Sequence, residues 1–278
     1  MNRRTVFGYL LMVVGLLLPL ALLTMMSASQ LMEQASYRQF QDAQKDWTKA
    51  QKKWVGNYHQ ERQKTDPATS DPFVESKTQE EQSPFEDGII GYVTIPKIGS
   101  TQPIRIGASE SHLERGVAQV TGTDLPVGGK GKRSVIAGHR SWYNDQRFLR
   151  IAELAPGDKI TIDLGVRRLE YVVQEVVLID ATDWQQLKAK KGQDMLTLLT
   201  CNPLYPPFNE RLLVNATRVL PQVSAQKASK LSQPNQITPQ KERFGLNPVF
   251  VLTGLGWLLL LVVCYAFWSR WKGSRQTV

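Results

Sequence analysis

Two uncharged apolar runs, one near each end of the chain, place the strongest constraint on how this sequence can fold. The first, VFGYLLMVVGLLLPLALLTMM, covers residues 6–26, and the second, PVFVLTGLGWLLLLVVCYAFW, covers residues 248–268. A helix of either length, at about 1.5 Å per residue, crosses roughly 30 Å of hydrocarbon. We therefore expect a transmembrane anchor over residues 1–27 and a transmembrane helix with a basic tail over residues 247–278. The first run is long for the core of a signal peptide, although SAS at 27–29 leaves cleavage there as an alternative.

Basic residues flank both runs on their outer sides. Arg3 and Arg4 precede the first run, and Arg270, Lys272 and Arg275 follow the second, with no acidic residue in either group. Because such residues stay in the cytoplasm, both termini are expected there, with the roughly 220 residues between the spans outside the cell membrane. These five residues also account for more than half of the formal net charge of +9, so no nucleic-acid partner is expected.

The segment from residue 28 to residue 86 begins as a juxtamembrane helix. Its apolar residues recur at alternating steps of three and four: Phe40, Ala43, Trp47, Ala50 and Trp54. This spacing predicts one helix whose narrow apolar stripe docks on the protein's own domain or on a second chain. From Glu61 to Glu86 the sequence is polar and contains three prolines, which predicts an extended segment or a lid.

Short β-rich runs separated by turn residues follow from Ile89 onward. They are IIGYVTIPKI, QPIRIG, RSVIAGH, DKITIDL, RRLEYVVQEVVLID, MLTLLTC and RLLVNATRV. This pattern predicts a single β-barrel or sandwich over residues 87–222. Two stretches between the runs, NDQRFLRIAEL and ATDWQQLKAKKG, are expected to form short helices, and the polar residues 223–246 a flexible linker.

Only one of the two cysteines, Cys201, lies outside the apolar runs, so the outer domain cannot form an internal disulfide. On a strand, Thr197, Leu199 and Cys201 share one face, and Asn202 with Pro203 ends the strand just after the thiol. A thiol at a strand end can meet a substrate. A lone cysteine after an apolar run is nevertheless more often a buried core residue, so both interpretations stand at this point.

A nucleophilic cysteine needs a neighbour that favours its thiolate. Of the three histidines, His59 and His112 are expected to be solvated, whereas His139 ends an apolar β-run at a glycine turn. Arg211 opens the strand after the cysteine loop and suits an oxyanion or a substrate carbonyl. Taken singly, His139 is typical of a hydrogen-bonded loop residue and Arg211 of a partner for a surface acid. No residue cluster has the spacing of a zinc site, so no metal or cofactor is expected.

Together these motifs resemble the sortases, the cysteine transpeptidases of Gram-positive cell surfaces. The motifs are TLLTC at 197–201, AGHR at 137–140 and the arginine that opens the next strand, within a resemblance running from Ile89 to Val219. The resemblance implies an all-β, sortase-type closed barrel of about eight strands with short helices. It further implies Cys201 as nucleophile, His139 as acid and Arg211 as oxyanion ligand. Thr200 and Leu199, just before the cysteine, are expected to bind substrate.

Two further features resemble the pilin-polymerising class C sortases: the second apolar run, and DPF at residues 71–73. In that class this motif is a lid, which implies that Asp71 approaches Arg211 and that Phe73, after Pro72, shields Cys201. Without the resemblance, an Asp-Pro pair is typical of a helix N-cap. The cysteine loop is one residue longer than is usual in the family, so the assignment of Arg211 depends on its position before LLV.

The resemblance implies cleavage of an LPxTG-like sorting signal after its threonine. The resulting thioester would pass to a lysine amine of the next pilin subunit. A housekeeping sortase, which transfers surface proteins to a peptidoglycan amine, is the alternative within this enzyme class. A membrane-tethered binding module with a structural Cys201 is the alternative outside it.

Overall fold

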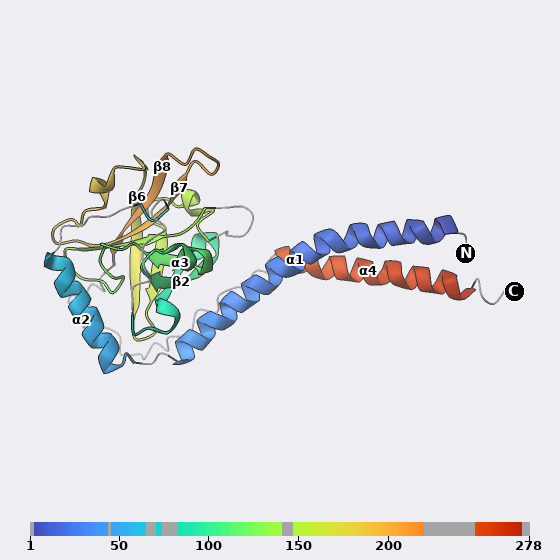
Figure 1. Ribbon diagram of the computed structural model, residues 1–278, viewed down its shortest axis with the longest axis horizontal. Helices are drawn as coiled ribbons and strands as arrows, with labels where there is room; N and C mark the ends of the chain where they lie inside the picture. Colours follow the sequence, from blue (N-terminus) through green and yellow to red (C-terminus); the bar gives the residue numbers. More distant parts are fainter. Residues whose placement is uncertain are drawn as a thin grey trace, which may run out of the picture. The chain divides into compact units, whose positions relative to one another are not determined.

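The computed structural model describes residues 3–43, 46–64, 71–73, 83–140, 147–219 and 248–273 (Figure 1). The chain divides into two compact units, Met1–Ala35 with Ser224–Val278, and Ser36–Val223. The predicted linker at 223–246 lies outside the described residues, as do residues 65–70 and 74–82 of the predicted lid segment.

The larger unit is a closed β-barrel of eight strands, which confirms the predicted fold class (Figure 1). The strands are β1 (Ile89–Ile95), β2 (Ser100–Ile106), β3 (Val117–Gln119), β4 (Lys132–Ala137), β5 (Lys159–Asp163), β6 (Arg168–Asp180), β7 (Asp194–Asn202) and β8 (Glu210–Arg218). Their order around the barrel is β1-β2-β3-β4-β7-β8-β6-β5. The sequence pattern missed β3, because three residues are too few to show an alternation.

Strands β4, β7 and β8 are neighbours although β4 is far from the other two in sequence. β7 runs parallel to β4 and antiparallel to β8. Both faces of β7 are buried: Leu196 and Leu198 belong to the main core, while Leu199 belongs to a second cluster on the opposite face. We call this second group the outer cluster, and its members are Ala108, Leu113, Ala118, Val120, Val135, Ala137, Leu187, Leu199 and Leu213. Burial on both faces explains why this strand is almost continuously apolar.

The predicted single helix through Phe40 and Trp54 is wrong. Helix α1 (Arg3–Ala43) ends before the stripe is complete, and α2 (Lys49–Lys64) starts afresh. A capping box stands at the start of α2: Gln51 N donates to Thr48 Oγ1 over 3.2 Å, and Thr48 N donates to Gln51 Oε1 over 2.8 Å. The predicted docking on the protein's own domain is confirmed, because Trp47 and Val55 lie in the barrel's core cluster.

In the described residues, each of the two predicted short helices of the barrel contains a 3₁₀ turn. ATDWQQLKAKKG contains one 3₁₀ turn, η4 (Trp184–Leu187), within the connection between β6 and β7. NDQRFLRIAEL contains η3 (Ile151–Glu153), and its first residues lie outside the described part of the chain. Two other 3₁₀ turns, η1 (Glu86–Gly88) and η2 (Pro96–Ile98), flank β1, and α3 (Glu110–Arg115) follows β2.

The smaller unit pairs the first part of α1 with α4 (Pro248–Gly273). Its candidate spans, Val6–Met25 and Val251–Ser269, have mean hydropathies of 2.5 and 2.1. Leu20 is buried against Gly256, and Ser27 Oγ lies 3.0 Å from Thr253 Oγ1. Leu260 and Val263 are also buried, whereas most other apolar side chains of the spans are exposed, up to 70% for Met25 and 68% for Leu261. Both helices are therefore long and apolar enough to cross a membrane.

Candidate active site

Three neighbouring strands bring Cys201, Arg211 and His139 to one site. Cys201 pairs directly with Arg211 in the β7–β8 ladder, and residues in such a pair project on the same face. In the parallel β4–β7 pair, Ala137 stands opposite Leu199, so two residues further along His139 comes level with Cys201. The pairing extends past β4, because Gly138 N donates to Leu199 O over 3.1 Å.

Gly138 permits the close packing that places His139. A Cβ atom at this position would lie 2.8 Å from the Phe148 ring and 2.9 Å from Val117, so any side chain would force the turn outward. The main chain of His139 is tied to the same aromatic residue, because Phe148 N donates to His139 O over 3.2 Å. The glycine turn noted in the sequence is thus a packing requirement.

The Arg211 guanidinium is buried and held on two sides. Its Nη1 donates to the backbone oxygens of Phe208 and Glu210, over 2.6 and 2.7 Å. Its Nε and Nη2 face the carboxylate of Asp71, with which it forms an ion pair. The longer cysteine loop does not displace the arginine, because the extra residue is accommodated before Glu210 and the pairing with Cys201 is kept.

The DPF segment lies directly against these residues. Asp71 Oδ1 accepts a hydrogen bond from Phe73 N over 3.0 Å, which folds the segment into a tight turn. The Phe73 ring centroid lies 5.5 Å from Arg211 Cζ and 5.7 Å from the His139 ring centroid. An anion and an aromatic face thus cover the arginine, and the same ring covers the histidine.

Comparison with known proteins agrees with this geometry. Residues 93–219 match the model of the Sortase domain family. The crystal structure of sortase C-3 from Streptococcus pneumoniae is similar at 35% identity and a TM-score of 0.57, over 61% of this chain and 82% of that one. The chain belongs to the sortase family.

Two further solved structures and one further protein are similar to this sortase. A pilus-related sortase C of Group B Streptococcus is 26% identical, with a TM-score of 0.59, over 65% of this chain and 95% of that one. Sortase C-1 of Actinomyces oris is 28% identical, with a TM-score of 0.56, over 62% and 99%. Sortase A of Bacillus anthracis is 32% identical over 113 residues, which are 41% of this chain and about half, 52%, of that protein.

The thiol of this sortase is held in its neutral form. Burial raises the pKa of Cys201 to about 11, the Arg211 guanidinium opposes this rise, and the Asp71 carboxylate adds to it. Asp71 therefore acts on the thiol in two ways, through its own charge and by partly neutralising the arginine. With the DPF segment in place, little thiolate exists near neutral pH.

A second polar row lies beside the first, and sequence analysis missed it. Arg140 Nη1 donates to Asn202 Oδ1, and Asn202 Nδ2 donates to Glu210 Oε2, each over 2.6 Å. These residues directly follow His139, directly follow Cys201 and directly precede Arg211 in the chain. The row therefore ties together the three strand ends that carry the site. Adjacency to the motif residues was the signal available in the sequence.

The two residues expected to bind substrate, Leu199 and Thr200, are both fully buried. Leu199 lies in the outer cluster, on the Cys201 face of β7. Thr200 faces the other way and its Oγ1 donates to Gly138 O over 2.7 Å, which supports the turn before His139. Direct contact of either side chain with a substrate stays a prediction.

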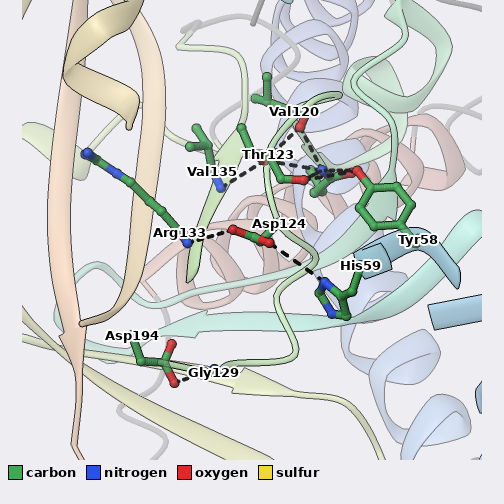
Figure 2. Close-up of polar contacts among 10 residues, drawn as sticks. Tyr58, His59, Val120, Thr123, Asp124, Gly129, Arg133, Val135 and Asp194 are labelled. Carbon is green, nitrogen blue, oxygen red and sulfur yellow. Dashed lines mark hydrogen bonds and ion pairs between the residues drawn. The ribbon is translucent and has the colours of Figure 1, made fainter. Parts of the chain in front are cut away.

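The expectation that His59 and His112 are solvated is wrong. His112 is 4% exposed on α3, with its Nδ1 2.8 Å from Gly107 O. His59 lies on the face of α2 that packs on the barrel, with its Nδ1 3.7 Å from Asp124 Oδ1 (Figure 2). Helix docking buries His112 and partly buries His59, and the polarity of the surrounding sequence gave no sign of it.

A cavity of about 290 Å³ begins two residues from Arg211 along β8. Its lining residues are Arg133, Glu175, Val177, Leu178, Ile179, Gln186, Lys190, Leu213 and Asn215. Leu213 and Asn215 share the face of β8 that carries Arg211, because they follow it at steps of two.

Proposed function

We propose that this sortase is a membrane-anchored cysteine transpeptidase of the class C type, which joins pilin subunits. The observation that carries the proposal is the direct pairing of Cys201 with Arg211, whose remaining donors face Asp71. A purely structural cysteine needs no buried arginine beside it. It also needs no carboxylate, such as that of Asp71, paired with this arginine where a substrate could displace it. Similarity to pilus-related sortases supports the same assignment.

The first step transfers an acyl group to the enzyme. With His139 taking the thiol proton, Cys201 Sγ attacks the carbonyl carbon of the threonine in an LPxTG-like sorting signal, and a carbon–sulfur bond forms. The carbonyl electrons move to the oxygen, where Arg211 Nε and Nη2 stabilise the charge. The bond to the glycine nitrogen then breaks, and that amine leaves with the proton from His139.

The second step releases the product. A lysine amine of the next pilin subunit attacks the thioester carbon, a carbon–nitrogen bond forms and the carbon–sulfur bond breaks. The ammonium proton passes through His139 to the departing sulfur, which restores the Cys201 thiol, and the product is an isopeptide bond between subunits. Because the first product leaves before the second substrate reacts, the kinetics are ping-pong.

Asp71, Pro72 and Phe73 act as a lid in this proposal. The Asp71 carboxylate occupies the two arginine donors that an oxyanion needs, so substrate and lid compete for the same groups. The Phe73 ring covers His139 and Arg211 and keeps the site apolar. Opening this lid frees the donors and removes a negative charge from the thiol's surroundings.

Two membrane spans hold the enzyme at the cell membrane, with both termini cytoplasmic and the barrel outside. The basic residues beyond both apolar runs support this topology. Confinement to one surface raises the effective concentration of enzyme and membrane-retained substrates. With Cys201 and Cys264 replaced by alanine, a cysteine reagent that cannot cross the membrane should label an Asp42→Cys variant in whole cells but not a Thr277→Cys variant.

A peptidoglycan amine is the alternative acceptor, as in a housekeeping sortase. The similarity to a sortase A supports this alternative. The thioester, once formed, can be offered both classes of amine. Preferential resolution by a lysine-containing pilin peptide supports pilin joining. Preferential resolution by a peptidoglycan fragment would assign the housekeeping role.

The experiment is intact mass spectrometry of the full chain in detergent micelles. The protein carries Asp71→Ala and Phe73→Ala, and it is incubated with a panel of LPxTG-type peptides. The expected result is an adduct ending at threonine, absent in Cys201→Ala and retained in Cys264→Ala, which removes the other cysteine. Absence of the adduct across the panel would contradict the proposal and favour a non-catalytic tethered module.

A further inference from the structure

Arg133 is a buried cation that the proposed chemistry does not use. It lies on β4 and is 3% exposed. Its backbone N–H donates to Asp124 Oδ2 over 3.0 Å, while its side chain runs in the opposite direction (Figure 2). Residues at steps of two share a strand face, so Arg133 is on the same face as Val135 and Ala137 of the outer cluster.

The guanidinium first ties together the two strands that carry the proposed nucleophile and oxyanion ligand. Its Nε donates to Thr197 Oγ1 over 2.9 Å, and its Nη2 donates to Asn215 Oδ1 over 2.5 Å. Thr197 and Asn215 form a direct pair in the β7–β8 ladder, four residues from the pair formed by Cys201 and Arg211. At a strand rise of roughly 3.3 Å per residue, the two pairs are about 13 Å apart.

The third nitrogen of the Arg133 guanidinium, Nη1, holds the connection between β6 and β7. Nη1 donates to Gln186 O over 2.5 Å and to Lys188 O over 3.1 Å, and both carbonyls belong to the connection between β6 and β7. Trp184 and Leu187 of this connection pack into the outer cluster. The same connection supplies Gln186 and Lys190 to the wall of the 290 Å³ cavity. Arg133 therefore sets the position of that wall relative to β7 and β8.

The charge of Arg133 is balanced within the same network. Asn215 Nδ2 donates to Glu175 Oε1 over 3.0 Å, so the Asn215 side chain links the guanidinium to a carboxylate. Burial lowers the pKa of Arg133 to about 10, and Glu175 opposes this, so the side chain stays protonated at neutral pH. Only an arginine offers enough donors in a fixed fork to reach four acceptors on three elements.

The distance from the site matches the reach of a sorting signal. In an extended peptide whose threonine carbonyl meets Cys201, the three or four preceding residues span about 10 to 13 Å. Laid along β7 towards the start of that strand, such a peptide would end level with Thr197 and Asn215, beside the cavity. The wall held by Arg133 is thus where the start of the motif and the residue before it would contact the enzyme.

We propose that Arg133 is a positioning residue that holds the β6–β7 connection as the wall of the groove for the part of the sorting signal preceding its threonine. This inference rests on the proposed function for its substrate. It assigns Arg133 no contact with the reacting atoms. Loss of the arginine should therefore weaken peptide binding and leave the chemistry at Cys201 largely intact.

The test compares Arg133→Met, Arg133→Lys and a matched control, Arg150→Met, in the full chain in detergent with the lid residues replaced by alanine. Arg150 is an exposed arginine paired with Glu153, so its removal takes away an equal charge outside the groove. Arg133→Met should raise KM for the peptide about tenfold, the equivalent of one or two lost hydrogen bonds. The value of kcat and the rate of Cys201 alkylation should stay within about threefold. Arg133→Lys should be intermediate.

Hydrogen exchange provides a readout that does not depend on activity. Amides of residues 184–190 should exchange at least about tenfold faster in Arg133→Met, with β7 and β8 unchanged. Unchanged exchange there, or an unchanged KM, would overturn the inference, and so would an equal effect in Arg150→Met. If the lid-substituted protein with Arg133 intact forms no peptide adduct, the proposed function fails, and the role of Arg133 in peptide binding fails with it. Hydrogen exchange of residues 184–190 then still decides whether Arg133 holds the β6–β7 connection.

Discussion

Cys201 and Arg211 occupy directly opposite positions in the β7–β8 ladder, one at the end of its strand and the other at the start of the next. A seven-residue loop, 203–209, joins the two strands. The loop returns its own Phe208 carbonyl to the guanidinium, so the cation is fixed beside the thiol by the hairpin itself. Asp71 binds the same guanidinium from a distant part of the sequence, so we expect the reactivity of Cys201 to depend on that contact.

Opening the lid should expose the thiol. Replacing Asp71 and Phe73 with alanine is expected to raise the rate of Cys201 alkylation by iodoacetamide about tenfold or more at pH 7.5, because one pKa unit of the thiol corresponds to a factor of ten in thiolate. The rate is measured by intact mass in a Cys264→Ala background. Asp42→Ala, which removes an exposed acid on α1, serves as the control. An unchanged rate would contradict the lid.

The pH profile of the same reaction should shift. In the parent protein, alkylation should rise with pH towards an inflection near the thiol pKa of about 11. Removing Asp71 takes away a charge that disfavours the thiolate, so the inflection should move to lower pH. Adding Arg211→Met to this variant removes the charge that favours the thiolate and should move it up again. Profiles that coincide in all three proteins would argue against electrostatic control by these residues.

Gly138→Ala should damage the site without removing any proposed catalytic residue. The new Cβ would meet Phe148 at 2.8 Å and Val117 at 2.9 Å, so the turn that carries His139 must move. We expect a loss of acyl-enzyme formation of at least about tenfold, since small misplacements of reacting groups are costly. Gly56→Ala on α2, where the structure leaves open space, is the matched control and should be neutral or stabilise by about 0.5–1 kcal/mol.

Thr48→Ala tests the capping box that separates α1 from α2. Loss of the hydrogen bond from Gln51 N should lower the free energy of unfolding by about 1 kcal/mol. Thr48→Ser, which keeps the hydroxyl, should restore most of it. Thermal unfolding of the full chain in detergent measures both. Equal midpoints for Thr48→Ala and the parent would show that docking alone starts the helix.

Local patterns were sufficient for much of this protein. Apolar length identified the two terminal helices, and alternation with turn residues identified seven of the eight strands. The motifs around His139, Cys201 and Arg211 named residues that the barrel does bring together. The capping box at Thr48 was also visible in the sequence. The stripe of apolar residues continues across it, however, and this stripe led to the prediction of one helix.

Other features depend on contacts between segments that are distant in sequence. Arg133 holds the β6–β7 connection, and Arg140 reaches Asn202, only because β4 lies beside β7 in the barrel. The burial of His59 likewise follows from the docking of α2. A sequence pattern reports the period and polarity of one segment, whereas strand order and helix docking are decided by the joint burial of many segments. The sequence by itself therefore determined the barrel class and the apolar ends, and it named the candidate reactive residues. Only the tertiary structure decided which buried charged groups contact the strands around that candidate site.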